Sequence, residues 1–291
     1  MNKSLKRIFE FPLIKIVLGT GICLLVLIGF QNFISKPFFH SLINFKPLAD
    51  SLINYTSVFV LLLTYYFLFI WYEKRQTHEL SKKNIILELS SGFFLGFLIL
   101  SCVFLILYLL GYYEVTQFTG FSYFLAPFSF LVIAALIEEI LFRAILYRIL
   151  ENWIGTYIAL FIISVLFELP HIFNDNVTLL SVILGLLFGF AHGIMFSYTK
   201  RIWLPFAFHL GWNLAQPFYG SSLSGIDDIG SVLEAKFYGP KLITGSVYGV
   251  EDSILSIVLL LIVCIIFLKL SIRENKIVKT SYNKVFYYKS K

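Results

Sequence analysis

The sequence predicts an all-α, multi-pass membrane protein with about eight transmembrane helices. Of its 291 residues, 58% are hydrophobic and only 14% are charged, whereas a soluble domain has about 45–50% apolar and about 25% charged residues. The apolar residues also form long runs, and about 20 such residues in a row are enough for a helix to cross a bilayer. The net charge of +6 does not indicate a nucleic-acid partner, because the basic residues lie between the apolar runs and form no single patch.

Eight segments have the length and polarity of membrane-spanning helices. They are residues 12–34, 52–72, 85–109, 122–148, 153–173, 178–199, 202–219 and 251–270. If the N-terminus is cytosolic, 17 of the 23 Lys and Arg residues lie in cytosolic segments and 4 in outer loops, as the positive-inside rule requires. The sequence therefore predicts a cell-membrane protein with both termini in the cytosol, and with a flexible outer loop at 220–249.

The fourth segment carries two adjacent carboxylates and an arginine inside an apolar helix. Glu138 and Glu139 point about 100° apart, so they cannot have the same role. Glu139 and Arg143 share one face, in the order that favours a helical ion pair. Glu138 has no partner on its own helix, and a lone charge at the bilayer centre costs ~3 kcal/mol or more. Glu138 must therefore face a polar interior, another helix or a metal.

Two further segments supply histidines. Phe167 and His171 lie four residues apart in the fifth segment, where Pro170 should end or kink the helix. His209 and Asn213 share one face of the seventh segment. Imidazole nitrogens are the commonest ligands of zinc-like cations. With a carboxylate to take a proton from a bound water and an amide to stabilise an oxyanion, these residue types fit a hydrolytic site.

Helix geometry allows Glu138 and His171 to meet, and His209 as well if the hairpin of the fourth and fifth segments projects roughly 10 Å further into the cytosol. The fourth and fifth segments form a hairpin that turns near residues 152–155. Glu138 lies about 15 residues before the turn and His171 about 18 after it, so at ~1.5 Å per residue their heights differ by only about 5 Å.

Three motifs, each inside one predicted span, resemble the signature of the CPBP family of intramembrane proteases (CAAX protease and bacteriocin-processing). The motifs are Glu138-Glu139-x-x-x-Arg143, Phe167-x-x-x-His171 and His209-x-x-x-Asn213. This family includes the CAAX prenyl endopeptidases of the Rce1 type and the bacterial Abi proteins. The resemblance extends over residues 120–220.

The resemblance implies an Rce1-like bundle in which Glu138 is the general base on water. The implied catalytic set is Glu138, Glu139, Arg143, His171, His209 and Asn213. In this set Glu139 and Arg143 form a supporting ion pair, while the two histidines and the asparagine bind a metal or stabilise the oxyanion. The expected ligands of a divalent metal, zinc in particular, are His171, His209 and Glu138. The implied substrate is a membrane-associated peptide or protein that reaches the site between helices or from the cytosol, and no nucleic acid is involved.

The resemblance also divides the chain into three parts. Residues 1–119 hold helices one to three, 120–220 the catalytic core of helices four to seven, and 221–291 the outer loop, helix eight and a basic cytosolic tail. One detail departs from the family pattern, because Glu168 and Pro170 stand where small apolar residues are expected. This departure concerns the substrate class more than the mechanism.

Other polar and small residues have structural explanations. A ridge of small residues at a strict four-residue interval predicts close helix packing in the sixth segment. The ridge consists of Ser181, Gly185, Gly189, Gly193 and Ser197. His192 lies beside this ridge and outside the motifs, so it is interpreted as a packing residue.

Two other function classes stay open. A non-catalytic membrane protein on the same fold, such as a bacteriocin-immunity factor or a scaffold, would act through its basic tail and outer loop. A proton-coupled transporter would also use intramembrane Glu and His residues, although the chain has no visible inverted repeats. The ordered motifs favour the peptidase over both.

Overall fold

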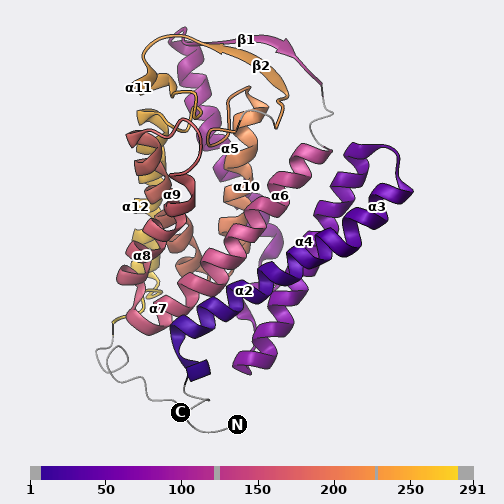
Figure 1. Cartoon of the computed structure of the whole chain (residues 1–291). Coiled ribbons are helices and arrows are strands. Elements are labelled where there is room, and N and C mark those ends of the chain that lie inside the picture. Colours follow the sequence, from indigo (N-terminus) through magenta and orange to yellow (C-terminus); the bar gives the residue numbers. More distant parts are fainter. Residues whose placement is uncertain (1–7, 121–124, 227–228, 281–291) are drawn as a thin grey trace.

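The computed structural model describes residues 8–120, 125–226 and 229–280, and it is helical at each of the eight predicted spans (Figure 1). The helices are α2 (Pro12–Phe30), α3 (Lys36–Leu42), α4 (Lys46–Glu73), α5 (Ile85–Leu109), α6 (Ala126–Glu138), α7 (Arg148–Ile154), α8 (Thr156–His171), α9 (Leu179–Thr199), α10 (Trp203–Phe218), α11 (Lys241–Thr244) and α12 (Ile254–Arg273), with the π-helices η1 (Gln31–Ser35) and η4 (Glu139–Tyr147) and the 3₁₀ turn η2 (His78–Leu80). The predicted cytosolic residues Lys3, Lys6 and Arg7, and the tail from residue 281 on, lie outside the described residues.

Five helical segments of the described chain are long and apolar enough to cross a membrane. They are Pro12–Leu42, Lys46–Glu73, Ile85–Leu109, Leu179–Thr199 and Ile254–Arg273. Helix α8 is apolar but shorter, α10 has 16 residues, and the α6–η4–α7 helix is interrupted by charged side chains. The chain is therefore a multi-pass, all-α membrane protein, but the five helices do not establish the predicted count of eight spans.

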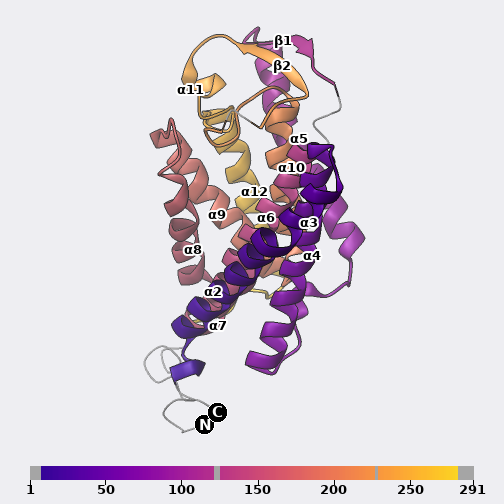
Figure 2. The ribbon, with the colours of Figure 1, turned by 45° about the vertical axis from the view of Figure 1, so that its right-hand side comes forward.

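The long α6–η4–α7 helix crosses the middle of the bundle (Figures 1 and 2). Helices α8, α9 and α12 lie on one side of it and α2, α3 and α4 on the other. The first predicted span is longer than expected, because η1 and α3 continue α2 as far as Leu42.

Helices α5 and α10 approach each other backbone to backbone. A Cβ atom at Gly92 would lie 2.5 Å from the Leu204 carbonyl oxygen, and one at Gly96 would lie 2.2 Å from that of Phe208. Gly211 of α10 is packed in the same way against the Phe93 carbonyl of α5. Because apolar burial does not drive helices together within lipid, such close approach supplies the van der Waals contact that holds the pair. It fixes α10, the helix of His209 and Asn213.

The small-residue ridge on α9 makes the close helix packing that was predicted, and its partner is α8. A Cβ atom at Gly189 would lie 2.7 Å from the Ser164 Cα atom, and one at Gly193 would lie 2.8 Å from Leu160 Cδ2. The ridge thus lets α8, which carries Phe167 and His171, lie directly on α9.

The outer loop is more ordered than its composition predicts. Strand β1 (Tyr113–Phe118) pairs antiparallel with β2 (Leu233–Phe237), with a register irregularity between Val115 and Gln117. This two-stranded sheet lies at the end of the bundle opposite the start of α2 and the end of α12 (Figure 1). The strands were missed because each is short and the segments lie more than 110 residues apart in sequence.

Ion pairs connect the helices at the end of the bundle opposite the β1–β2 sheet. Arg148 of α7 lies 2.9 Å from Glu73 of α4, and Arg75 donates hydrogen bonds to Glu79 at 2.6 and 2.9 Å. Glu79 is 3% exposed and also accepts a hydrogen bond from Tyr65. A buried carboxylate is tolerated only when several donors satisfy it, so this network fixes the α4–α5 connection against α7.

Candidate active site

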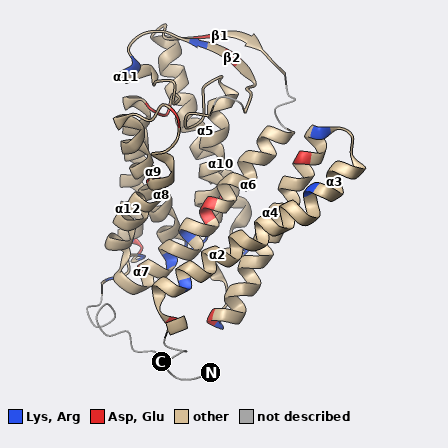
Figure 3. Ribbon diagram, in the orientation of Figure 1, with Lys and Arg blue, Asp and Glu red and all other residues tan. Residues whose placement is uncertain are grey.

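Charged positions in the middle of the bundle lie on the α6–η4 helix (Figure 3). Glu138 ends α6 with its side chain 28% exposed, and its Oε2 atom lies 3.7 Å from Nε2 of His209. Glu139, the next residue, is fully buried. The two neighbouring carboxylates therefore occupy different environments, as their separation around the helix predicts.

His209 lies between the two carboxylates. Its Nδ1 atom is 3.0 Å from Glu139 Oε1, while its Nε2 atom faces Glu138. An ionised carboxylate can only accept, so Nδ1 donates to Glu139 and Nε2 is left without that proton in the neutral ring. Glu139 thereby fixes the orientation and tautomer of the imidazole that Glu138 approaches.

The predicted ion pair between Glu139 and Arg143 is confirmed. Arg143 Nη1 lies 3.2 Å from Glu139 Oε1, and both side chains are 0% exposed. The guanidinium also stacks over the Phe167 ring at 4.4 Å, a cation–π contact that partly replaces lost hydration. Both charges lie in the π-helix η4, a helix form that is rare and often found at functional sites.

His171 ends α8 directly after Pro170, as the proline predicts. Its Nδ1 atom lies 2.9 Å from the Phe167 carbonyl oxygen. Since a carbonyl can only accept, Nδ1 donates there and Nε2 has its lone pair free in the neutral ring. The Phe167 ring packs against that of His171 with centroids 5.1 Å apart.

A cavity of about 160 Å³ joins the motif residues. Its polar wall includes Glu138, Glu168, His171, His209, Asn213 and Glu251. The structure thus brings four predicted site residues to one cavity, whereas Glu139 and Arg143 lie behind its wall. The cavity contains carboxylates but no Lys or Arg among the described residues that line it.

Glu251 was missed by the sequence interpretation. It is 4% exposed and accepts hydrogen bonds from Trp212 Nε1 at 3.0 Å and Gln216 Nε2 at 2.9 Å. Ser224 donates to its other oxygen through its backbone N–H at 2.8 Å and its hydroxyl at 2.7 Å. Glu251 thus attaches the outer loop to α10, and an acid at the first position of a predicted apolar span was the available signal.

Tyr248 also reaches the cavity from the outer loop. Burial raises the pKa of its hydroxyl, and the nearby charge of Glu251 raises this pKa further. Tyr248 is therefore a neutral phenol at pH 7 and can donate a hydrogen bond into the cavity.

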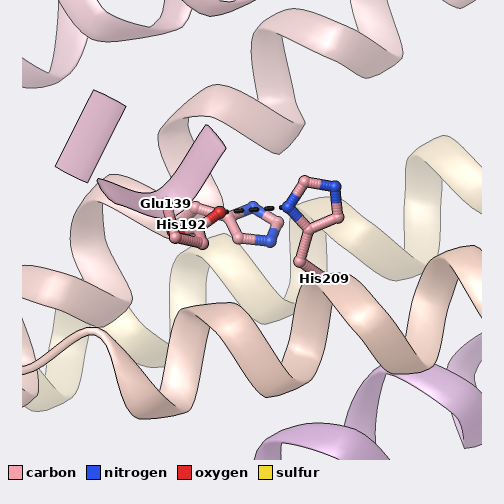
Figure 4. A group of neighbouring side chains, drawn as sticks. All are labelled: Glu139, His192 and His209. Atoms are coloured by element: carbon pink, nitrogen blue, oxygen red, sulfur yellow. Dashed lines mark hydrogen bonds and ion pairs between the residues drawn. The ribbon is translucent and has the colours of Figure 1, made fainter. Parts of the chain in front are cut away.

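One group among the described residues has the donors for a metal ion. Ligand atoms of Glu139, His192 and His209 lie within 4.8 Å of one another, and all three residues are buried (Figure 4). His192 Nε2 and Glu139 Oε2 have no hydrogen-bond partner in the described structure. This group shares His209 with the expected ligand set but contains Glu139 and His192 in place of Glu138 and His171. His192 was assigned to packing because it lies outside the motifs.

Comparison with known proteins gives a match over the same part of the chain. Residues 120–215 match the family described as type II CAAX prenyl endopeptidase Rce1-like. No curated protein and no solved structure matches the chain. The family match covers α6, η4, α7, α8 and α9 and most of α10, the helices that hold the three motifs. Residues 120–215 are therefore an Rce1-like domain, which confirms the family indicated by the motifs.

Proposed function

We propose that this protein is an intramembrane endopeptidase that hydrolyses a peptide bond in a membrane-associated protein or peptide. The Rce1-like match supports a protease of the CAAX type. The observation that carries the proposal is Glu138, whose Oε2 atom has no hydrogen-bond partner among the described residues although it lines the cavity. We further propose residues 120–220 as the catalytic core.

In this mechanism Glu138 takes a proton from water as the water attacks the carbonyl carbon of the scissile bond. His209 orients the water through Nε2, since its other nitrogen is held by Glu139. Asn213 lines the same cavity and donates to the oxyanion that forms. Glu138 then returns the proton to the departing amine, so that one water is consumed and two chain ends are released.

The donor set fits a divalent metal, with zinc as the expected ion. Glu139, His192 and His209 would hold it, and the unpartnered Oε2 atom of Glu139 and Nε2 atom of His192 support this assignment. When bound, such an ion lowers the pKa of a coordinated water and polarises the substrate carbonyl. The charge of Arg143 already compensates the charge of Glu139. Glu139, His192 and His209 therefore attract a metal cation less strongly than they would without Arg143.

We propose that substrate reaches the cavity from the outer side of the membrane. The cavity is lined by α6 from Phe130 to its end at Glu138, by the end of α8, the start of α9 and the middle of α10, and by the outer-loop segments 223–226 and 248–251. Of these, the end of α8, the start of α9 and the outer-loop segments lie towards the end of the bundle that carries β1 and β2 (Figure 1). With the termini in the cytosol, as the Lys and Arg distribution favours, this end is outside the cell. Access from the outer side differs from the two expected routes, which were between helices or from the cytosol.

The test compares the membrane and secreted peptides of cells that contain wild-type protein, Glu138→Gln or the control Glu234→Gln. Glu138→Gln keeps the side-chain shape but cannot accept the proton, so we expect one or more uncut membrane peptides to accumulate. Glu234 lies exposed on β2, away from the cavity, and its variant should match wild type. Unchanged peptides with Glu138→Gln, at equal protein level, would refute hydrolysis and favour a non-catalytic scaffold.

A further inference from the structure

Glu168 is a buried acid that the proposed mechanism does not use. It lies in α8 between Phe167 and His171, is 4% exposed and lines the cavity. Its Oε1 atom has no hydrogen-bond partner in the described structure. Burying an unpaired carboxylate costs several kcal/mol, so Glu168 either takes up a proton or gains a cation that enters the cavity.

Gly185 of α9 makes room for this carboxylate. A Cβ atom at position 185 would lie 1.6 Å from Glu168 Oε2 and 2.5 Å from its carboxyl carbon. Any other residue at position 185 would therefore displace the carboxylate. By contrast, Gly189 and Gly193 of the same ridge face apolar groups and the α8 backbone.

The other acids of the cavity have assigned partners or roles. Glu251 accepts four hydrogen bonds, two on each oxygen, and Glu138 is the proposed base. No Lys or Arg is found among the described residues of the lining. Glu168 is therefore the cavity carboxylate whose Oε1 atom has no hydrogen-bond donor and which has no Lys or Arg partner among the described residues of the lining.

We propose that Glu168 forms a subsite for a basic side chain, lysine or arginine, of the peptide substrate. This inference rests on the proposed peptidase function and adds a substrate class to it. Glu168 lies three residues before His171 on α8, so the two share one helix face, and the bound basic residue would lie beside the scissile bond. Leu184, Phe188 and Leu223 line the same cavity and would pack the aliphatic stem of that residue.

The test uses purified full-length protein in lipid nanodiscs. The probes are membrane-associated peptides in which each position in turn holds Lys, norleucine or Glu. Norleucine keeps the length of lysine without its charge. In wild type, one position should favour Lys over norleucine by about tenfold or more in kcat/KM, the scale of a charge-assisted hydrogen bond. Glu168→Gln should remove this preference, and Glu168→Lys should favour Glu at the same position.

A matched set of variants separates charge from shape. Gly185→Ala leaves the acid in place but displaces its carboxylate, so it should reduce the Lys preference. Glu234→Gln removes an exposed charge of the outer loop and should leave the Lys preference unchanged. Equal use of Lys and norleucine at every position by wild type, or an undiminished Lys preference in Glu168→Gln, would overturn the subsite.

Binding distinguishes failure of the subsite from failure of the peptidase proposal. The same peptides, with a photoreactive group, are cross-linked to Glu138→Gln and to Glu138→Gln with Glu168→Gln. If cross-linking to Glu138→Gln favours Lys, the double variant loses this preference and wild type cleaves none of the peptides, the subsite is supported and the peptidase proposal is refuted. Cleavage without any Lys preference in either assay supports the peptidase and refutes the subsite.

Discussion

Replacing Gly96 by alanine should displace α10 and lower both stability and activity. The added Cβ atom would lie 2.2 Å from the Phe208 carbonyl oxygen and 2.9 Å from the Trp212 nitrogen. Both atoms belong to the α10 backbone and cannot rotate away. To reach ordinary contact at 3.4 Å, the two helices must separate by about 1 Å.

Two free-energy terms set the size of the effect. Overpacking of this kind costs about 1–3 kcal/mol, and alanine recovers up to about 1 kcal/mol of helix propensity over glycine. The net loss is therefore on the order of 1–2 kcal/mol. Because His209 and Asn213 move with α10, a shift of about 1 Å should lower cleavage by on the order of 10²-fold.

The assay pairs thermal unfolding in detergent with cleavage of the peptide identified in cells. Gly29→Ala in α2 is the matched control, since a Cβ atom there meets nothing within 4 Å. It should be neutral or slightly stabilising. If Gly96→Ala unfolds and cleaves like Gly29→Ala, the close α5–α10 contact does not position the site.

Three further predictions concern the charged residues. Burial alone raises the pKa of Glu79, but the hydrogen bonds of Arg75 and the charges of Arg148 and Arg75 outweigh it, so the pKa lies below its usual value. The stability from this network is therefore present above the usual pKa of about 4.3 and is lost as pH falls through the lowered pKa. Glu79→Gln should be less stable than wild type at pH 7. Thermal unfolding at a series of pH values should show that the difference in stability between the two proteins shrinks towards pH 3. Arg143→Met leaves Glu139 as a buried, uncompensated charge and should lower the free energy of unfolding by about 3–5 kcal/mol. Denaturant unfolding measures this loss, and a loss under about 0.5 kcal/mol would contradict a stabilising role of the buried ion pair. Removal of metal by a chelator should abolish cleavage, and added zinc should restore it. Elemental analysis should find less bound metal in His192→Phe than in wild type. Cleavage that survives complete metal removal would exclude a role of the metal in the reaction.

The motifs predicted the contacts that are made within one helix, because helical spacing limits where neighbouring groups can lie. Glu139 and Arg143 pair through i, i+4 spacing, and Pro170 ends α8 beside His171. These are local relations that one helix determines. They required no knowledge of how the bundle packs.

The features that were missed depend on contacts between distant segments. His192 comes within reach of Glu139 and His209 only because α9 packs beside η4 and α10. Glu251 reaches α10 through a folded outer loop, and β1 pairs with a strand more than 110 residues away. Gly92 and Gly96 of α5 repeat at the four-residue interval of the α9 ridge, so that signal was present in the sequence.

The most direct test of the arrangement is the reaction of a cysteine at position 138 with a charged, membrane-impermeant maleimide. Cys23, Cys102 and Cys264 are first replaced by alanine, so that Glu138→Cys provides the only thiol. We expect labelling when the reagent is added outside intact cells and none for Ile140→Cys, whose native side chain is 0% exposed. Labelling only in inverted vesicles would place the cavity mouth in the cytosol. A thiol at 138 that reacts from neither side would contradict a water-filled site at this residue.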